Sequence, residues 1–100
     1  MAKIIPVRVF DFVVFGATGD LTLRKLLPAL YYRFRDGQMP ADSRVIGAAR
    51  SALTDDAFRE KAQRALEEHV LPNDLDSAVL RRFLDRLNYI SLDAAADKAD

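Results

Sequence analysis

Residues 16 to 20 read Gly-Ala-Thr-Gly-Asp, and their types and order suit the binding of an anion. Glycine lets the backbone turn sharply and lets a ligand approach it closely. If a helix begins here, its first amides lack partners within the helix, and the positive end of the helix dipole lies behind them. The pattern therefore predicts a phosphate or dinucleotide site, with a tight structural turn as the alternative interpretation.

The spacing of this turn assigns separate tasks to its residues. It reads Gly16-x-x-Gly19-x-x-Thr22. The common form is G-x-G-x-x-G, and here Val14 occupies the place of the first glycine. We expect Gly16 to form the turn and Gly19 to allow the close approach of a diphosphate. Thr18 can donate its hydroxyl to a phosphate or cap the helix, and Thr22 is slightly large for a position that packs helix against strand.

Charged side chains follow the turn. Asp20 suits the first turn of a helix because its charge complements the dipole. Lys25 lies one helical turn after Leu21, and helical side chains lean towards the N-terminus, so its ammonium can reach the mouth of the phosphate site. Arg24 points about 100° away and is expected to be solvated. An ordinary surface lysine is the alternative interpretation for Lys25.

The end of a second strand, Ala48-Ala49-Arg50-Ser51, bears on the choice of nucleotide. In a dinucleotide-binding fold this strand end faces the adenosine ribose, where a carboxylate binds the 2′-hydroxyl of NAD and an arginine accommodates the 2′-phosphate of NADP. Arg50 has the forked donors that suit a phosphate, and Ser51 adds a hydroxyl. These residues favour NADP, and a solvent-facing arginine is the alternative.

Hydrophobic periodicity predicts the elements that must position these residues. Two apolar runs, residues 12–15 and 45–49, are typical of buried strands in a parallel sheet, the first of them buried on both faces. A stripe of apolar residues at helical spacing runs from Leu23 to Phe34. Pro28 lies inside this stripe, and we expect a kink there and not a stop.

The rest of the chain carries signals for two more helices, a third strand and the start of a further helix. Asp36-Gly37 ends the first helix. A second helix is capped at Thr54 before Asp55-Asp56 and is broken at Leu71-Pro72-Asn73-Asp74, and a third begins at Asp76 or Ser77. A strand over 88–91 and a helix start over 93–100 follow. The order β-α-β-α-α-β predicts a right-handed parallel sheet, the first half of a doubly wound α/β fold.

Composition excludes several classes of function. Half of the 100 residues are hydrophobic, which indicates a globular chain. Lys+Arg and Asp+Glu both count 15, so no net charge attracts nucleic acid or an acidic membrane. Cysteine is absent, which excludes disulfides and thiolate metal sites and agrees with a reducing cytoplasm. The N-terminus, interrupted by Pro6 and Arg8, makes a poor signal peptide, and the uncharged run at 12–19 is too short to cross a bilayer, so we expect a soluble protein.

Two segments, DFVVFGATGDLTLRKLLPALY and IGAARS, together resemble the N-terminus of the glucose-6-phosphate dehydrogenase family. That family typically shows a Gly-Ala-Ser/Thr-Gly-Asp-Leu-Ala turn, a basic cluster ending in lysine, a proline within the helix and a Gly-x-x-Arg strand end. The resemblance runs along essentially the whole chain, and the combination is far more specific than the turn alone. The chain departs from the pattern at Thr22, usually alanine, and at Leu23, often a basic residue.

The resemblance implies a Rossmann-type fold and the NADP-linked oxidation of glucose 6-phosphate to 6-phosphogluconolactone, which opens the oxidative pentose phosphate pathway. It also implies a cofactor site whose first part comprises Gly16, Ala17, Thr18, Gly19, Asp20 and Leu21. Arg50 and Ser51 are implied at the 2′-phosphate, and Lys25 near both cofactor and substrate. Asp93 and Ala94 match a loop near the adenine. The resemblance further implies a homo-oligomeric enzyme.

The family's catalytic residues are expected outside this sequence. Its catalytic histidine segment, Asp-His-Tyr-Leu-Gly-Lys, and its later Glu-Lys-Pro motif do not occur in residues 1–100. We therefore expect residues 1–100 to be an N-terminal fragment of an NADP-binding domain. The rest of that domain and a β+α catalytic domain are expected to follow.

Two other classes of protein remain as alternatives. An extended short-chain reductase or epimerase also uses a GATG turn and needs a later Tyr-x-x-x-Lys pair, which residues 1–100 lack. A non-catalytic NADP-sensing module of the same fold is the second alternative. The Arg24-Lys25 pair and Pro28, at the spacing of the resembled family, argue against both.

Overall fold

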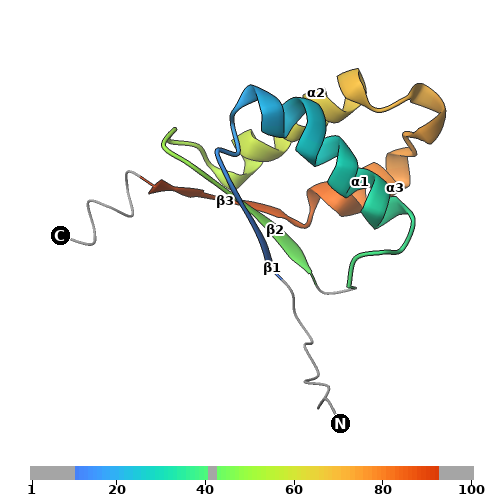
Figure 1. Cartoon of the computed structure of the whole chain (residues 1–100), viewed down its shortest axis with the longest axis horizontal. Coiled ribbons are helices and arrows are strands. Elements are labelled where there is room, and N and C mark those ends of the chain that lie inside the picture. The colour runs from blue at the N-terminus through green and yellow to red at the C-terminus, as the bar shows by residue number, and fades with distance from the viewer. Residues whose placement is uncertain (1–10, 41–42, 93–100) are drawn as a thin grey trace, which may run out of the picture.

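The computed structural model describes residues 11–40 and 43–92, which form a parallel sheet covered by helices (Figure 1). The strands are β1 (Asp11–Phe15), β2 (Arg44–Ala49) and β3 (Leu87–Ser91), and the α-helices are α1 (Leu27–Arg35), α2 (Asp55–His69) and α3 (Ser77–Leu84). A π-helical turn, Thr22–Leu26, leads into α1, and a 3₁₀ turn, Pro72–Asp74, lies between α2 and α3. The predicted order of elements is confirmed, and the helix start expected over 93–100 lies outside the described residues.

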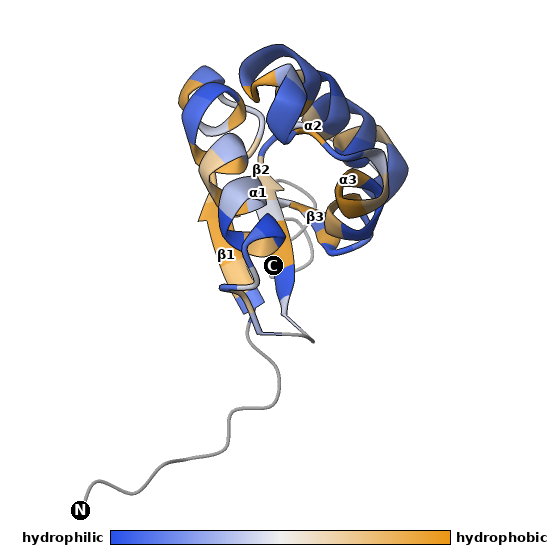
Figure 2. Ribbon diagram, turned by 90° about the vertical axis from the view of Figure 1, so that its right-hand side faces the viewer, coloured by the Kyte–Doolittle hydropathy of each residue, from blue (hydrophilic) through white to orange (hydrophobic). Residues whose placement is uncertain are grey.

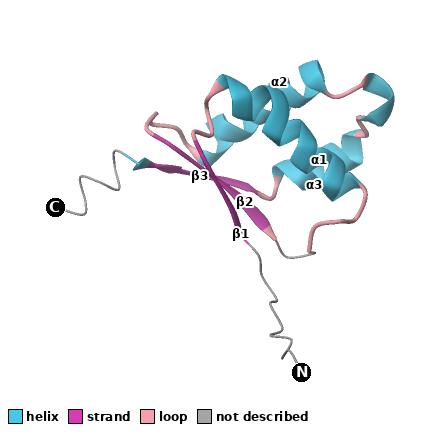
Figure 3. Cartoon of the chain, viewed as in Figure 1, coloured by secondary structure: helices cyan, strands magenta, loops and turns pink. Residues whose placement is uncertain are grey.

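The sheet has the strand order of the first half of a doubly wound fold. β2 lies between β1 and β3, and both pairings are parallel. The register places Phe15 opposite Ala48 and Ala49 opposite Ser91. Because the strands are parallel, their carboxyl ends meet at one edge of the sheet, where such folds bind their ligands. The helices gather on one face of the sheet (Figure 3).

β1 is less buried than its apolar sequence predicts. Val14 is buried against the helices, but Val13 is 52% exposed and Phe15 is 71% exposed. Figure 2 shows β1 as an apolar strand at the border of the sheet. The expectation that β1 is buried on both faces is wrong for this chain, because within the described residues β1 pairs on one side and helices cover one face. β2, which is paired on both sides, is largely buried as predicted.

The first helix continues through Pro28, as predicted. It begins at Asp20 and runs to Arg35, and its irregularity is a π-helical turn immediately before the proline. In that turn the Leu27 amide donates to the Thr22 carbonyl, five residues back. Proline has no amide to donate and crowds the carbonyl four residues earlier, so a wider turn relieves both constraints.

The predicted helix ends agree with the structure. Gly37 has a φ of +73°, and its amide donates to Phe34 while that of Gln38 donates to Arg33, which closes α1. The Thr54 side chain accepts from the Ala57 amide at 3.0 Å and begins α2. These are local signals, and each acts within a few residues of the helix end that it fixes.

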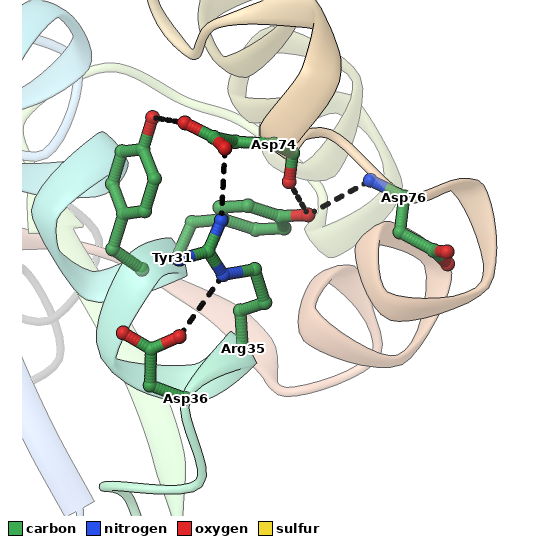
Figure 4. A network of polar contacts seen from close by, with 6 residues as sticks. Tyr31, Arg35, Asp36, Asp74 and Asp76 are labelled. Carbon is green, nitrogen blue, oxygen red and sulfur yellow. Dashed lines mark hydrogen bonds and ion pairs between the residues drawn. The ribbon is translucent and has the colours of Figure 1, made fainter.

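A polar network joins α1 to the segment before α3 (Figure 4). The Tyr31 hydroxyl donates to the Asp74 carbonyl at 2.9 Å and accepts from the Asp76 amide at 3.1 Å. The Asp74 carboxylate accepts from the Tyr32 hydroxyl at 2.8 Å and pairs with Arg35 at 3.2 Å. The hydrogen bond to Asp74 raises the pKa of the Tyr32 hydroxyl above its ordinary value. The network fixes the short connection between α2 and α3 over α1.

The core lies between the sheet and the helices. Its largest fully buried hydrophobic side chains are Tyr31, Phe58, Phe83, Leu27, Leu66, Leu87 and Val45. Among the helices in residues 11–40 and 43–92, none combines the length and the hydrophobicity needed to cross a membrane.

Candidate nucleotide-binding site

The glycine turn after β1 has the conformation that its sequence predicts. Gly16 has a φ of +69°, which side chains other than glycine rarely adopt. A Cβ on Gly19 would lie 3.1 Å from the Gly16 carbonyl oxygen, which accepts from the Gly19 amide at 2.9 Å. The assignment of the turn to Gly16 is confirmed, and a side chain at position 19 would crowd the Gly16 carbonyl. The close approach of Gly19 to a diphosphate stays a prediction.

The helix after this turn begins without a side-chain cap. The Leu23 amide donates to the Gly19 carbonyl at 3.1 Å, so glycine occupies the N-cap position. Thr18, the predicted alternative cap, lies outside that position and is half-buried. The first amides of a sixteen-residue helix, Asp20 to Arg35, therefore point at the mouth of the turn with the positive end of the dipole behind them. This arrangement suits a diphosphate.

The turn is held against β2 by close packing. The Ala17 amide donates to the Ala48 carbonyl at 3.2 Å, and the Ala17 side chain is completely buried. A Cβ on Gly47 would lie 2.7 Å from the Ala17 Cβ and 2.6 Å from Phe58 Cζ. Ala17 therefore packs the turn against β2, and its predicted contact with a cofactor stays a prediction. Gly47 is not among the residues that the sequence predicts for the site; the only signal is a glycine inside a strand, which often marks a close backbone approach.

The two basic residues of the helix border different grooves, and the reach of Lys25 to the phosphate site stays a prediction. Arg24 pairs with Asp20 at 3.0 Å and borders a groove against α2. Lys25 borders a groove of about 440 Å³ on the β1 side of the helix. The other residues that line this second groove are Phe15, Leu21, Thr22, Leu26 and Ala29. Asp20 is the first residue of the helix, as the interpretation that its charge complements the dipole requires. Lys25 lies beside the strand end that leads into the glycine turn.

Arg50 and Ser51 lie at the carboxyl end of β2, on the same edge of the sheet as the glycine turn. Both are exposed, and Ala49 and Arg50 supply no carboxylate at this strand end. The Ser51 carbonyl accepts from the Tyr89 hydroxyl at 2.6 Å. The Tyr89 ring packs on Phe58 with its centroid 5.2 Å away. Tyr89 is not among the predicted site residues, because a tyrosine in an apolar strand gives no sequence signal beyond packing.

The remaining predicted contacts, Asp93 and Ala94, lie outside the described residues. β3 ends at Ser91, beside the end of β2, so the chain leaves the sheet at the edge that carries Arg50. Within residues 11–40 and 43–92, no group of three or more His, Asp or Glu side chains is placed to hold a metal ion. The described part of the site thus combines a glycine turn, an uncapped helix start and an exposed guanidinium, which together suit a phosphorylated dinucleotide.

Comparison with known proteins places this site in a family. Residues 13–99 match the family model described as glucose-6-phosphate dehydrogenase, NAD binding domain. The chain is 47% identical over 97 residues to glucose-6-phosphate 1-dehydrogenase of Rhizobium meliloti, covering 97% of this chain and 20% of the relative. It is 52% identical over 88 residues to the enzyme of that name from Mycolicibacterium smegmatis, covering 88% of this chain and 18% of the relative.

Solved structures agree with the match. A glucose-6-phosphate dehydrogenase in complex with its substrate glucose-6-phosphate superimposes with a TM-score of 0.74 at 33% identity, covering 91% of this chain and 18% of that one. The glucose-6-phosphate 1-dehydrogenase of Mycobacterium avium gives a TM-score of 0.72 at 32% identity, covering 82% of this chain and 17% of that one. The chain spans about a fifth of the length of the curated relatives it matches. It therefore belongs to the glucose-6-phosphate dehydrogenase family, and its sheet and helices are part of that family's NAD-binding domain.

Proposed function

We propose that the chain forms the NADP-binding part of a cytoplasmic, homo-oligomeric glucose-6-phosphate dehydrogenase. This enzyme oxidises glucose 6-phosphate at C1 to 6-phosphogluconolactone. The NADP that this chain would hold would supply the acceptor for the C1 hydride, and the proton of the C1 hydroxyl would pass to a base. Membership of the family supports the reaction, and favours it over the reductase, epimerase and sensing-module alternatives.

The observation that carries the choice of NADP is Arg50. It is exposed at the carboxyl end of the second strand of a doubly wound sheet, where NAD-specific folds place a carboxylate. The guanidinium offers a planar fork of donors that matches a phosphate, and Ser51 adds a hydroxyl. A 2′-phosphate at this position supplies the charge that Arg50 complements, whereas a 2′-hydroxyl does not.

Other residues have separate roles in the proposed enzyme. The helix start after Gly19 holds the diphosphate, which its unpaired amides and dipole stabilise. Lys25, in the groove beside Phe15, lies towards the substrate and the reactive end of the cofactor. Asp93 and Ala94 contact the adenine end. None of these roles requires a side chain from the buried interface between the sheet and the helices.

The test uses a protein of full family length. In this chimera the chain replaces the matching segment of the Mycolicibacterium smegmatis enzyme, which is 52% identical to it over 88 residues. The chimera and its Arg50→Ala variant are titrated with NADP and with NAD at fixed ionic strength. A charge-assisted contact to a phosphate is worth about 1.5–3 kcal/mol, so the variant should bind NADP about one to two powers of ten more weakly. NAD binding should hardly change.

A matched control exists on the same strand. Arg44 lies at the opposite end of β2, is also exposed and pairs with Asp11 at 2.9 Å. Arg44→Ala should leave the ratio of NADP to NAD affinity unchanged. Arg50→Asp should go further than Arg50→Ala, because it repels the phosphate and offers the ribose hydroxyls a carboxylate. Equal weakening of both cofactors by Arg50→Ala would show that Arg50 supports the fold, and the assignment of NADP would be wrong.

A further inference from the structure

We infer that Tyr89 is a positioning residue for the 2′-phosphate site, acting through the segment that carries Arg50 and Ser51. This inference rests on the proposed function, because it assigns to β3 a part in recognising the phosphorylated ribose. The sequence gives no such signal, since Tyr89 lies in an apolar strand 38 residues after Ser51 along the chain.

The contact itself is short and well supported. The Tyr89 hydroxyl donates to the Ser51 carbonyl at 2.6 Å, at the short end of the range for hydrogen bonds between oxygens. The ring is held by Phe58, with the centroids 5.2 Å apart. The backbone is held as well, because the Tyr89 amide donates to the Asp55 carboxylate at 2.8 Å. Tyr89 therefore presents its hydroxyl from a fixed place.

The segment that Tyr89 holds joins two fixed ends. Ala49 is paired with Ser91 in the sheet, and Thr54 caps α2. Between these ends the chain crosses the carboxyl edge of the sheet as an irregular segment, residues 50–53. The hydrogen bond to the Ser51 carbonyl fixes the Ser51–Ala52 peptide group, one residue beyond Arg50, in the middle of this crossing.

Fixing this segment before the ligand arrives strengthens binding. A long arginine side chain on a mobile backbone must be ordered when it binds a phosphate, and that ordering opposes binding. With the Ser51 peptide already fixed, part of this ordering is complete in the free protein. The gain applies to ligands that contact Arg50, so it is specific for the 2′-phosphate.

The test compares two nucleotides that differ in this phosphate alone. Isothermal titration calorimetry with 2′,5′-ADP and with 5′-AMP is carried out on the unchanged chimera and on its Tyr89→Phe, Arg50→Ala and double variants. Tyr89→Phe keeps the ring on Phe58 and removes only the hydroxyl. It should weaken 2′,5′-ADP by about three- to tenfold, the range of one neutral hydrogen bond, and leave 5′-AMP unchanged. The double variant should bind 2′,5′-ADP no more weakly than Arg50→Ala, because Tyr89 acts through Arg50.

Tyr31→Phe is the matched control. It also removes a tyrosine hydroxyl that joins two segments, here α1 and the segment that contains Asp74 and Asp76. It should lower stability without changing the ratio of the two nucleotide affinities. Hydrogen exchange of the segment 50–53 in the free protein should become faster in Tyr89→Phe and stay unchanged in Tyr31→Phe.

The outcomes separate this inference from the proposed function. If Arg50→Ala weakens 2′,5′-ADP selectively and Tyr89→Phe does not, the inference is wrong and the proposed NADP site stands. If Tyr89→Phe weakens both nucleotides equally, its hydroxyl serves the fold alone, and the inference is again wrong. If Arg50→Ala itself has no selective effect, the NADP assignment fails first, and with it the part assigned to Tyr89.

Discussion

Gly47 is the residue whose replacement should disturb the sheet most for the smallest change in chemistry. Gly47→Ala adds one methyl group, which would lie 2.6 Å from Phe58 Cζ and 2.7 Å from the Ala17 Cβ. Carbon atoms in contact prefer about 3.5–4.0 Å, so the two neighbours must each move or the strand must shift by about 1 Å. Phe58 is enclosed, with 1% of its surface exposed. Ala17 is part of the glycine turn, and its Cβ can move only if the backbone of the turn moves with it. Neither can swing aside.

The magnitude follows from these contacts. Overpacking of a core typically costs about 1–3 kcal/mol, and two opposed contacts place this site near the upper end. Replacing glycine by alanine in a strand returns about 0.5–1 kcal/mol of backbone entropy. The net destabilisation is therefore about 2 kcal/mol, or about 30-fold in an opening equilibrium.

Hydrogen exchange of the β2 amides in the chimera measures this quantity directly, because it reports local opening without requiring the whole protein to unfold in one step. We expect exchange to become about 30-fold faster in Gly47→Ala. Phe58→Leu removes the ring atoms that clash, so the double variant should be less destabilised than the sum of the single variants, by about 1 kcal/mol or more. The argument that Phe58 and Ala17 leave no room for a side chain at position 47 would be refuted by unchanged or slower exchange in Gly47→Ala. It would also be refuted if the destabilisation of the double variant equalled the sum of the single variants.

Two further predictions concern the exposed parts of the chain. In the chimera, Lys25→Ala should lower glucose 6-phosphate turnover far more than Arg24→Ala, because Lys25 borders the groove beside Phe15 while Arg24 pairs with Asp20; small and equal effects in a steady-state assay would make Lys25 an ordinary surface residue. The isolated chain of residues 1–100 should be poorly folded or self-associating, because no described strand pairs with the outer edge of β1 and its Val13 and Phe15 are exposed. Analytical ultracentrifugation with thermal melting tests this, and a monodisperse monomer that melts cooperatively would contradict it.

Much of the fold was predictable because its signals are local. Gly16 is needed at a positive φ, Thr54 caps the helix that follows it, and Gly37 closes the helix that precedes it. The apolar runs gave the strands, and the alternation of strands and helices gave the parallel order. The turn, the caps and the strands depend on residues that lie close together in the chain, where the conformation is largely a property of the segment itself. The parallel order instead follows from the alternation of elements along the chain.

The burial of β1 was not predictable in the same way. A continuous apolar run indicates that a strand belongs in a core, but it does not say which partners supply that core. In the described residues the helices cover one face, so Val13 and Phe15 are exposed although their sequence is that of a central strand. For the first helix, Pro28 predicted a kink, and the form that the irregularity takes, a π-helical turn immediately before the proline, was not predicted.

For the site, the sequence by itself determined the chemistry that is available: a turn with the right glycines, a helix start that suits a diphosphate, and an arginine where NADP-binding folds recognise a 2′-phosphate. Only the tertiary structure decided how these parts are held. Gly47 leaves room against β2 for both Ala17 and the Phe58 ring, and the Tyr89 hydroxyl, 38 residues further along the chain, holds the Ser51 carbonyl at 2.6 Å. Such contacts join residues that share no local pattern, and they come to exist only when the sheet forms, with β1 beside β2 for Ala17 and Gly47 and β2 beside β3 for Tyr89.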